Sequence, residues 1–213
     1  MRDLARYIQN RIGAVVRGRG PVNTAPAEGR VPPGQRVVKN FPVLDLGERP
    51  AVEPAAWTLE VSGCVEQALL LDWAAFRALP ETSLTADIHC VTRWSRLDVP
   101  WVGVAVRTVL AQARPLAEAR YVTLHSHDGY TSNLPLEAVL EAEALLAYRV
   151  DGKPLRREHG GPVRLVVPSR YFWKSAKWIR GIELHAEDRP GFWETRGYHN
   201  QGDPWKEERY RGQ

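Results

Sequence analysis

Cys90 has the surroundings of a reactive thiol. It ends a predicted strand in the run IHCVTRWSRLDVPW and is followed by Arg93, Trp94 and Arg96. Nearby positive charge favours the thiolate, which is both a nucleophile and a soft metal ligand. His89 is not expected to be its general base, because neighbouring residues of a strand point to opposite faces. From the residues alone, structural, nucleophilic and metal-binding roles for Cys90 stay open.

The other cysteine, Cys64, forms no CxxC motif, so zinc-ribbon and thioredoxin chemistry are not indicated. It is expected to be a small buried apolar side chain. A zinc hydrolase built on His125, His127 and Asp128 is a weaker alternative, since no HExxH spacing accompanies these residues.

The segment 149–180 combines positive charge, glycines and aromatic rings. It holds nine basic side chains against Asp151 and Glu158, and contains the run REHGGPVRLVVPSRYFWKSAKWIRGIEL. The Gly160-Gly161 pair allows a ligand to approach the backbone closely. Basic side chains and a hydroxyl suit a phosphate monoester, and aromatic rings suit a flat ring system. Neither GxGxxG nor a P-loop is present, so dinucleotide and ATP sites are not indicated.

Charge is distributed unevenly along the 213 residues, whose net charge is +4. Residues 1–39 carry eight basic and two acidic side chains, and outside this segment and 149–180 there are 12 basic against 21 acidic. An acidic body would repel a polyanion, so nucleic acid is not an expected partner. No run approaches the ~20 apolar residues of a membrane span. The N-terminus lacks the apolar core of an export signal, so a cytoplasmic location is expected.

The hydrophobic pattern predicts an α+β protein with a mixed sheet, because strands and helices alternate irregularly. The expected strands cover 57–62, 67–71, 83–90, 121–126, 145–150, 163–168 and 179–185. One expected helix begins after Asp72 as its N-cap and ends at residue 79, and two others cover 104–113 and 136–142. We expect three parts: a basic N-terminal helix and arm over 1–36, a central domain over 37–188, and an aromatic, charged tail over 189–213 packed on it.

Four stretches give the chain a family resemblance: KNF at 39–41, HCVTRWS at 89–95, DGYTSNLPL at 128–136 and HGGPVRLVVPSRYFWKSAKW at 159–178. Together they resemble the molybdopterin-binding domain of the sulfite oxidase family, in its compact bacterial form. The resemblance implies the mixed-sheet fold of that domain over about 37–188. It also implies molybdenum with one pyranopterin and two-electron oxygen-atom transfer.

The resemblance implies a role for each matching residue. Cys90 would be the thiolate ligand of molybdenum, with Tyr130 near the metal and Arg93 or Arg96 stabilising an oxyanion substrate. Contacts to the pterin or its phosphate would come from Asn40, Phe41, Ser126, His159, Arg164, Ser175 and Lys177.

Two departures from the family pattern bear on the substrate and the partner. Animal sulfite oxidases have an Asn-Arg-Arg run shortly after the cysteine, where this chain has Thr92-Arg93-Trp94-Ser95. Reduction of an S-oxide or N-oxide is therefore an alternative to sulfite oxidation.

The chain has no room for a haem domain, so a separate electron-transfer partner is expected. The twin-arginine signal of periplasmic relatives is missing. A further alternative is a non-catalytic pterin- or anion-binding module.

Overall fold

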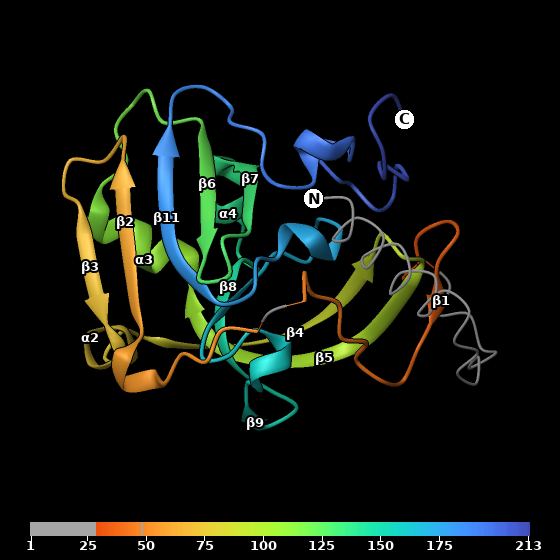
Figure 1. The fold of residues 1–213 in the computed structure, drawn as a ribbon, viewed down its shortest axis with the longest axis horizontal. Coiled ribbons are helices and arrows are strands. Elements are labelled where there is room, and N and C mark those ends of the chain that lie inside the picture. Colours follow the sequence, from red (N-terminus) through yellow and green to blue (C-terminus); the bar gives the residue numbers. More distant parts are fainter. Residues whose placement is uncertain (1–28, 48) are drawn as a thin grey trace.

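The computed structural model describes residues 29–47 and 49–213, which form two β-sheets joined by short helices and turns (Figure 1). The predicted N-terminal helix and most of its arm lie outside the described residues. No helix in the described part of the chain is long and apolar enough to span a bilayer.

The first sheet has five strands in the order β3-β2-β11-β6-β7. Its strands are β2 (Thr58–Gly63), β3 (Leu69–Asp72), β6 (Tyr121–Ser126), β7 (Thr131–Pro135) and β11 (Ile179–His185). The β2 and β11 strands run parallel and the other neighbours antiparallel, so the sheet is mixed. The hydrophobic pattern predicted β2, β3, β6 and β11, and the structure confirms these strands with small shifts of their ends.

The second sheet is built around a long strand. Its members are β1 (Arg36–Val37), β4 (Glu81–Cys90), β5 (Trp94–Ala105), β8 (Leu145–Val150), β9 (Lys153–Pro154) and β10 (Arg164–Val166). One side of β5 pairs with β4, while the other side pairs first with β1 and then with β8. No strand was predicted directly after Cys90, but only a tight turn at 91–93 separates β4 from β5.

Short helices cover the sheets: α2 (Trp73–Arg77), α3 (Val106–Ala113) and α4 (Leu136–Leu140), with 3-10 turns η1 (Pro54–Ala56), η2 (Arg157–His159), η3 (Phe172–Lys174) and η4 (Glu194–Arg196). The predicted N-cap is confirmed, since the Asp72 carboxylate accepts a hydrogen bond from Ala75 N at 2.8 Å. The buried residues of α3 recur at helical spacing, so one face of the helix packs on the core.

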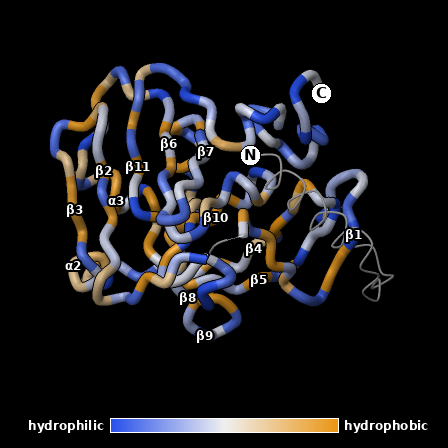
Figure 2. The backbone as a smooth tube through the Cα atoms, viewed as in Figure 1, coloured by the Kyte–Doolittle hydropathy of each residue, from blue (hydrophilic) through white to orange (hydrophobic). Residues whose placement is uncertain are grey.

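The hydrophobic core has two parts. The larger lies on the five-stranded sheet under α3 and contains Trp57, whose indole Nε1 donates to Ile179 O at 2.8 Å. The smaller surrounds Cys90 and contains the aromatic rings of the second sheet and of η3. Figure 2 shows the hydrophobic residues, in orange, gathered on the strands, with much less orange on the segment after β11.

Gly103 allows β5 and β8 to lie close together. A Cβ atom at this position would lie 2.1 Å from Leu146 O and 2.7 Å from Ala147 Cα. We expect Gly103→Ala to lower the free energy of unfolding by about 2 kcal/mol, because the backbone of β8 must move to admit the methyl group. Urea denaturation with an unchanged m-value is the measurement. The exposed Thr85→Ala substitution on β4 is the control, expected within about 0.5 kcal/mol of wild type; equal stabilities of the two variants would contradict the prediction.

Candidate active site

A cavity opens where the two sheets meet. Its walls come from the segment 41–46, the turn 90–94, residues 128–130, η2 with the start of β10, the loop 172–178, and Trp193 with Tyr198. The space measures about 950 Å³, including the part open to solvent. Seven of the predicted site residues line it: Phe41, Cys90, Tyr130, His159, Arg164, Ser175 and Lys177.

The thiol of Cys90 is buried at the end of β4, where the turn into β5 fixes its backbone. Cys90 O accepts from Arg93 N at 3.0 Å and from Gln35 Nε2 at 3.0 Å. The Thr92 hydroxyl donates to Cys90 Sγ at 3.1 Å. Burial raises the pKa of the thiol, and the Thr92 hydrogen bond and the charge of Arg209 oppose this. The thiol is therefore protonated unless a bound cation takes the place of its proton.

Arg164 places an unpaired positive charge inside the fold. Its guanidinium donates to His159 O at 2.9 Å, Ser175 O at 2.7 Å and Leu165 O at 3.3 Å, and lies 4.1 Å from the centre of the Phe172 ring. No carboxylate of the described chain forms an ion pair with it. Burial lowers its pKa to about 9. A buried cation with hydrogen bonds but no counter-ion favours an anionic ligand.

Lys177 adds a second, partly buried cation. Its Nζ donates to Glu158 O at 3.1 Å and lies 4.2 Å from the Trp178 ring. Burial lowers its pKa to about 7, the charge of Arg164 adds to this effect, and Asp45 and Asp128 oppose it. The chain can pass close to Lys177 only because residue 160 is glycine: a Cβ there would lie 2.8 Å from Lys177 Cβ.

The acidic residues of the cavity have partners of their own. The Asp45 carboxylate pairs with Arg49 at 2.7 Å, and the Asp128 carboxylate accepts from Tyr130 N at 3.1 Å. Burial raises the pKa of Asp128. The cavity therefore keeps a positive character around Arg164.

His159 and Phe41 form one flat flank of the cavity. Their rings stack with centroids 4.1 Å apart and an interplanar angle of 15°. Burial lowers the pKa of His159 to about 4, with Arg164 and Arg156 adding to the effect, so the imidazole is neutral near pH 7. Trp94, which also lines the cavity, has a buried Nε1 without an acceptor in the described structure.

Three predicted site residues do not line the cavity. Asn40 and Arg93 are exposed, and Arg93 takes the left-handed conformation of the turn at φ 68°. Ser126 is buried at the end of β6, and its hydroxyl has no hydrogen-bond partner there. Arg96, the alternative to Arg93, pairs with Asp151 at 2.6 Å. Neither arginine lines the cavity, and the Arg96 guanidinium lies behind its wall, 5.6 Å from the centre of the Phe41 ring.

Two of the lining residues have hydroxyl groups that the fold already uses. Ser175 Oγ accepts from Val167 N at 3.0 Å, which shapes the loop before β11. The Tyr130 hydroxyl donates to Trp173 O at 2.7 Å. Burial, with the charge of Glu194 adding to it, holds the pKa of Tyr130 well above its ordinary value, so this hydroxyl stays protonated.

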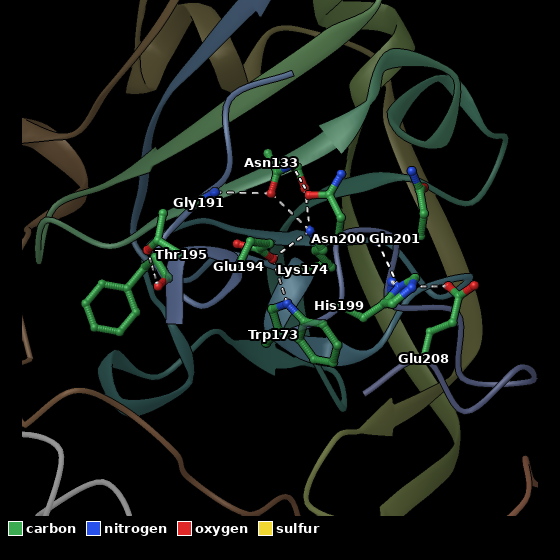
Figure 3. Close-up of polar contacts among 12 residues, drawn as sticks. Asn133, Trp173, Lys174, Gly191, Glu194, Thr195, His199, Asn200, Gln201 and Glu208 are labelled. Atoms are coloured by element: carbon green, nitrogen blue, oxygen red, sulfur yellow. Dashed lines mark hydrogen bonds and ion pairs between the residues drawn. The ribbon is translucent and has the colours of Figure 1, made fainter. Parts of the chain in front are cut away.

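Sequence reasoning pointed to the aromatic rings of 149–180, which include Trp173, but it missed the aromatic residues after 188 and the polar cluster behind this wall. Trp173, Trp193 and Tyr198 line the cavity beside the cysteine. Behind them, Lys174 and Glu194 form a buried ion pair, shown with its neighbours in Figure 3. The density of tryptophan and tyrosine after residue 188 was the available signal. Those rings were expected over the outside, and some of them instead reach the cavity.

The expected zinc alternative is wrong for the described residues. No group of three or more histidine, cysteine, aspartate or glutamate side chains among them could hold a metal ion. His125 Nε2 instead pairs with Glu183 at 3.0 Å across β6 and β11.

Comparison with known proteins assigns the family. The sequence profile of the oxidoreductase molybdopterin binding domain matches residues 46–193. The uncharacterized oxidoreductase YuiH of Bacillus subtilis is 47% identical over 192 residues, which cover 90% of this chain and 97% of that protein. The protein-methionine-sulfoxide reductase catalytic subunit MsrP of Campylobacter jejuni is 30% identical over 179 residues, covering 73% of this chain and 60% of that protein.

A solved structure supports the same fold. The sulfane dehydrogenase SoxCD of Paracoccus pantotrophus matches with a TM-score of 0.61 and 22% identity, over 70% of this chain and 42% of that chain. This likeness concerns the fold alone, and it agrees with the predicted α+β architecture. The chain is an oxidoreductase and belongs to the sulfite oxidase-type family of molybdopterin-binding domains.

Proposed function

We propose that the cavity holds molybdenum with one pyranopterin, that Cys90 is the protein ligand of the metal, and that the enzyme transfers an oxygen atom to or from a small substrate. The observation that carries this proposal is that a buried thiol and a buried guanidinium without a counter-ion line one cavity. A soft thiolate suits the metal, and the guanidinium suits an anion.

The residues that line the cavity fit the molybdenum–pterin group. Arg164 and Lys177 would bind its phosphate, and the stacked rings of Phe41 and His159 would offer a flat flank to its ring system. The buried Trp94 Nε1 still lacks an acceptor, which a polar ligand would supply. Asn40 and Ser126 stay family-derived expectations, since neither lines the cavity.

When bound, the molybdenum–pterin group supplies the two-electron redox chemistry. Cys90 must lose its proton to act as a ligand, and the Thr92 hydroxyl stabilises the resulting sulfur charge by its hydrogen bond. The protonated Tyr130 hydroxyl holds the backbone of Trp173, so its part is to keep that wall in place. The aromatic side chains around Cys90 limit the access of water.

Reduction of a neutral S-oxide is favoured over oxidation of sulfite. Sulfite is an anion, and its binding near Cys90 would be stabilised by a positively charged side chain. Of the two arginines predicted for this role, Arg93 is exposed and Arg96 is paired with Asp151. Trp173 and Tyr198 line the cavity near the cysteine instead. The 30% identity to a protein named as a methionine-sulfoxide reductase supports the same choice.

The overall reaction balances as follows. The S-oxide takes up two electrons and two protons, its S–O bond breaks, and a sulfide and water leave. A separate electron-transfer protein supplies the electrons, and an N-oxide would react in the same way. The cytoplasmic location stays a prediction from the sequence.

Steady-state assays of the loaded enzyme test the substrate. With reduced viologen as donor, a small sulfoxide should be turned over with a higher kcat/KM than sulfite is with an artificial electron acceptor. The reason is that the described cavity wall offers an anionic substrate no cation besides Arg164 and Lys177. A higher kcat/KM for sulfite would contradict this preference, and turnover of neither class would contradict the proposed reaction.

Substitution of the two cysteines tests the metal ligand. Cys90→Ser should lose most of its molybdenum and its activity, because an alcohol is a poorer donor than a thiolate for this metal. Cys64→Ser is the matched control: Cys64 does not line the cavity, so metal content and activity should match wild type. Metal analysis of both proteins from a host that makes the cofactor gives the answer. Equal molybdenum in the two variants would rule out Cys90 as the ligand.

The pKa of Lys177 predicts a pH dependence of anion binding by the cofactor-free protein. Because that pKa is lowered to about 7, Lys177 is charged below pH 7 and neutral above it. Sulfate, which stays a dianion across this range, should therefore bind more weakly as pH rises from 6 to 8. Lys177→Arg should remove most of the dependence, since a guanidinium stays charged. Calorimetric titrations that show equal slopes for both proteins would contradict the assignment.

A further inference from the structure

The segment after the matched family domain completes the cavity. The family profile ends at residue 193, and the following residues supply Glu194 and Tyr198. This segment is fastened to the site at two points. Gly202 O accepts from Tyr171 N at 2.7 Å, and the buried Arg209 guanidinium donates to Val91 O, next to Cys90, at 2.9 Å.

Glu194 is the centre of the polar cluster in Figure 3. Its carboxylate is almost fully buried, with 2% of the residue exposed, and one oxygen serves two donors. Glu194 Oε1 lies 2.6 Å from Lys174 Nζ and accepts from Trp173 Nε1 at 2.9 Å. Lys174 also donates to Asn133 O at 2.8 Å and to Asn133 Oδ1 at 3.1 Å.

Stability alone gives little reason to keep such a pair. Replacing a buried ion pair by apolar residues of similar volume is often neutral or stabilising. The Lys174–Glu194 pair instead fixes the orientation of a neighbouring side chain. Trp173 and Lys174 are consecutive residues of η3, and both side chains bind the same carboxylate oxygen, so the indole is fixed in one orientation.

The fixed indole forms part of the wall beside Cys90. Trp173 meets the Tyr198 ring edge to face, with centroids 5.2 Å apart, and stacks on Tyr171 at 5.4 Å. The packing is tight on the side of Gly202, where a Cβ would lie 2.9 Å from the indole. Rotation of the indole would therefore open the wall and change the shape of the cavity.

We propose that Glu194 is a positioning residue for the substrate wall: its carboxylate holds the Trp173 indole against Tyr198, and Trp173 and Tyr198 determine which small neutral substrates the cavity binds. The identity of the substrate as an S-oxide rests on the proposed function. The positioning of the Trp173 indole by Glu194 does not depend on which substrate is used, so an experiment can contradict one proposal and leave the other intact.

Two double variants separate positioning from charge pairing. Lys174→Met/Glu194→Gln removes the ion pair but keeps an acceptor oxygen for Trp173 Nε1. Lys174→Met/Glu194→Leu removes the ion pair and the acceptor together. Neither variant leaves a buried charge unpaired, so both should fold, as a single thermal transition would show.

The first readout is hydrogen exchange of the tryptophan indoles, followed by NMR on the full chain and assigned with Trp173→Phe. In wild type, the Trp173 indole proton should exchange more slowly than that of the exposed Trp205. The Gln-containing double variant should keep this protection, and the Leu-containing one should exchange at least about tenfold faster. Equal exchange of Trp173 and Trp205 in wild type overturns the proposal without any variant.

The second readout is the split between KM and kcat of the loaded enzyme with dimethyl sulfoxide. The Leu-containing variant should raise KM about tenfold with little change in kcat, because a displaced wall weakens substrate binding. The Gln-containing variant should stay within about threefold of wild type in KM. Equal KM values for the two variants overturn the proposal. Inactivity of the wild-type enzyme towards every S-oxide overturns only the proposed function, and the exchange measurement still decides the role of Glu194.

Discussion

The buried guanidinium of Arg164 is the constraint around which the site is organised. An isolated charge inside a protein is costly, and here three backbone carbonyls and the Phe172 ring offset part of that cost. Two of those carbonyls, from His159 and Ser175, belong to the two irregular segments that wall the cavity. The same hydrogen bonds that make burial of the charge possible therefore fix both segments. Of the nine basic side chains over 149–180, Arg164 and Lys174 are the two that are buried.

Most strands could be predicted from runs of apolar residues or from alternation, but β5 and β7 were missed for physical reasons. Pro100 lies in β5 at the gap where the β1 partner has ended and the β8 partner begins at Trp101, so its missing N–H is tolerated there. In β7, Ser132 and Asn133 are buried polar residues, which a hydropathy pattern reads as a loop. Asn133 is satisfied by Asp188, Asn200, Gly191 and Lys174, all distant in sequence.

The site residues, too, could be predicted only in part from local sequence patterns. Contiguous motifs pointed to Cys90, His159, Arg164 and Lys177, and all four line one cavity. Arg93 and Asn40 shared those motifs, yet a turn at positive φ and an exposed position put them elsewhere. Tyr198 belonged to no motif, because its place in the wall depends on how the segment after β11 folds back. Proximity in sequence alone does not place two residues in one site: Phe41 lines the cavity, whereas its neighbour Asn40 is exposed.

The cost of burying a positive charge is offset in different ways at Lys174 and at Arg164, the two buried cations of the segment 149–180. Lys174 has a carboxylate from its own chain at 2.6 Å and two further acceptors, and it does not line the cavity. Arg164, which binds Ser175 O, has only carbonyl acceptors and does line the cavity. The fold supplies an internal counter-ion to Lys174 in η3 but none from the described residues to Arg164 in β10, so the charge of Arg164 is available to a ligand. The contrast supports both proposals: a bound anion would match the positive charge of Arg164, and the charge of Lys174 would help Glu194 to hold the wall.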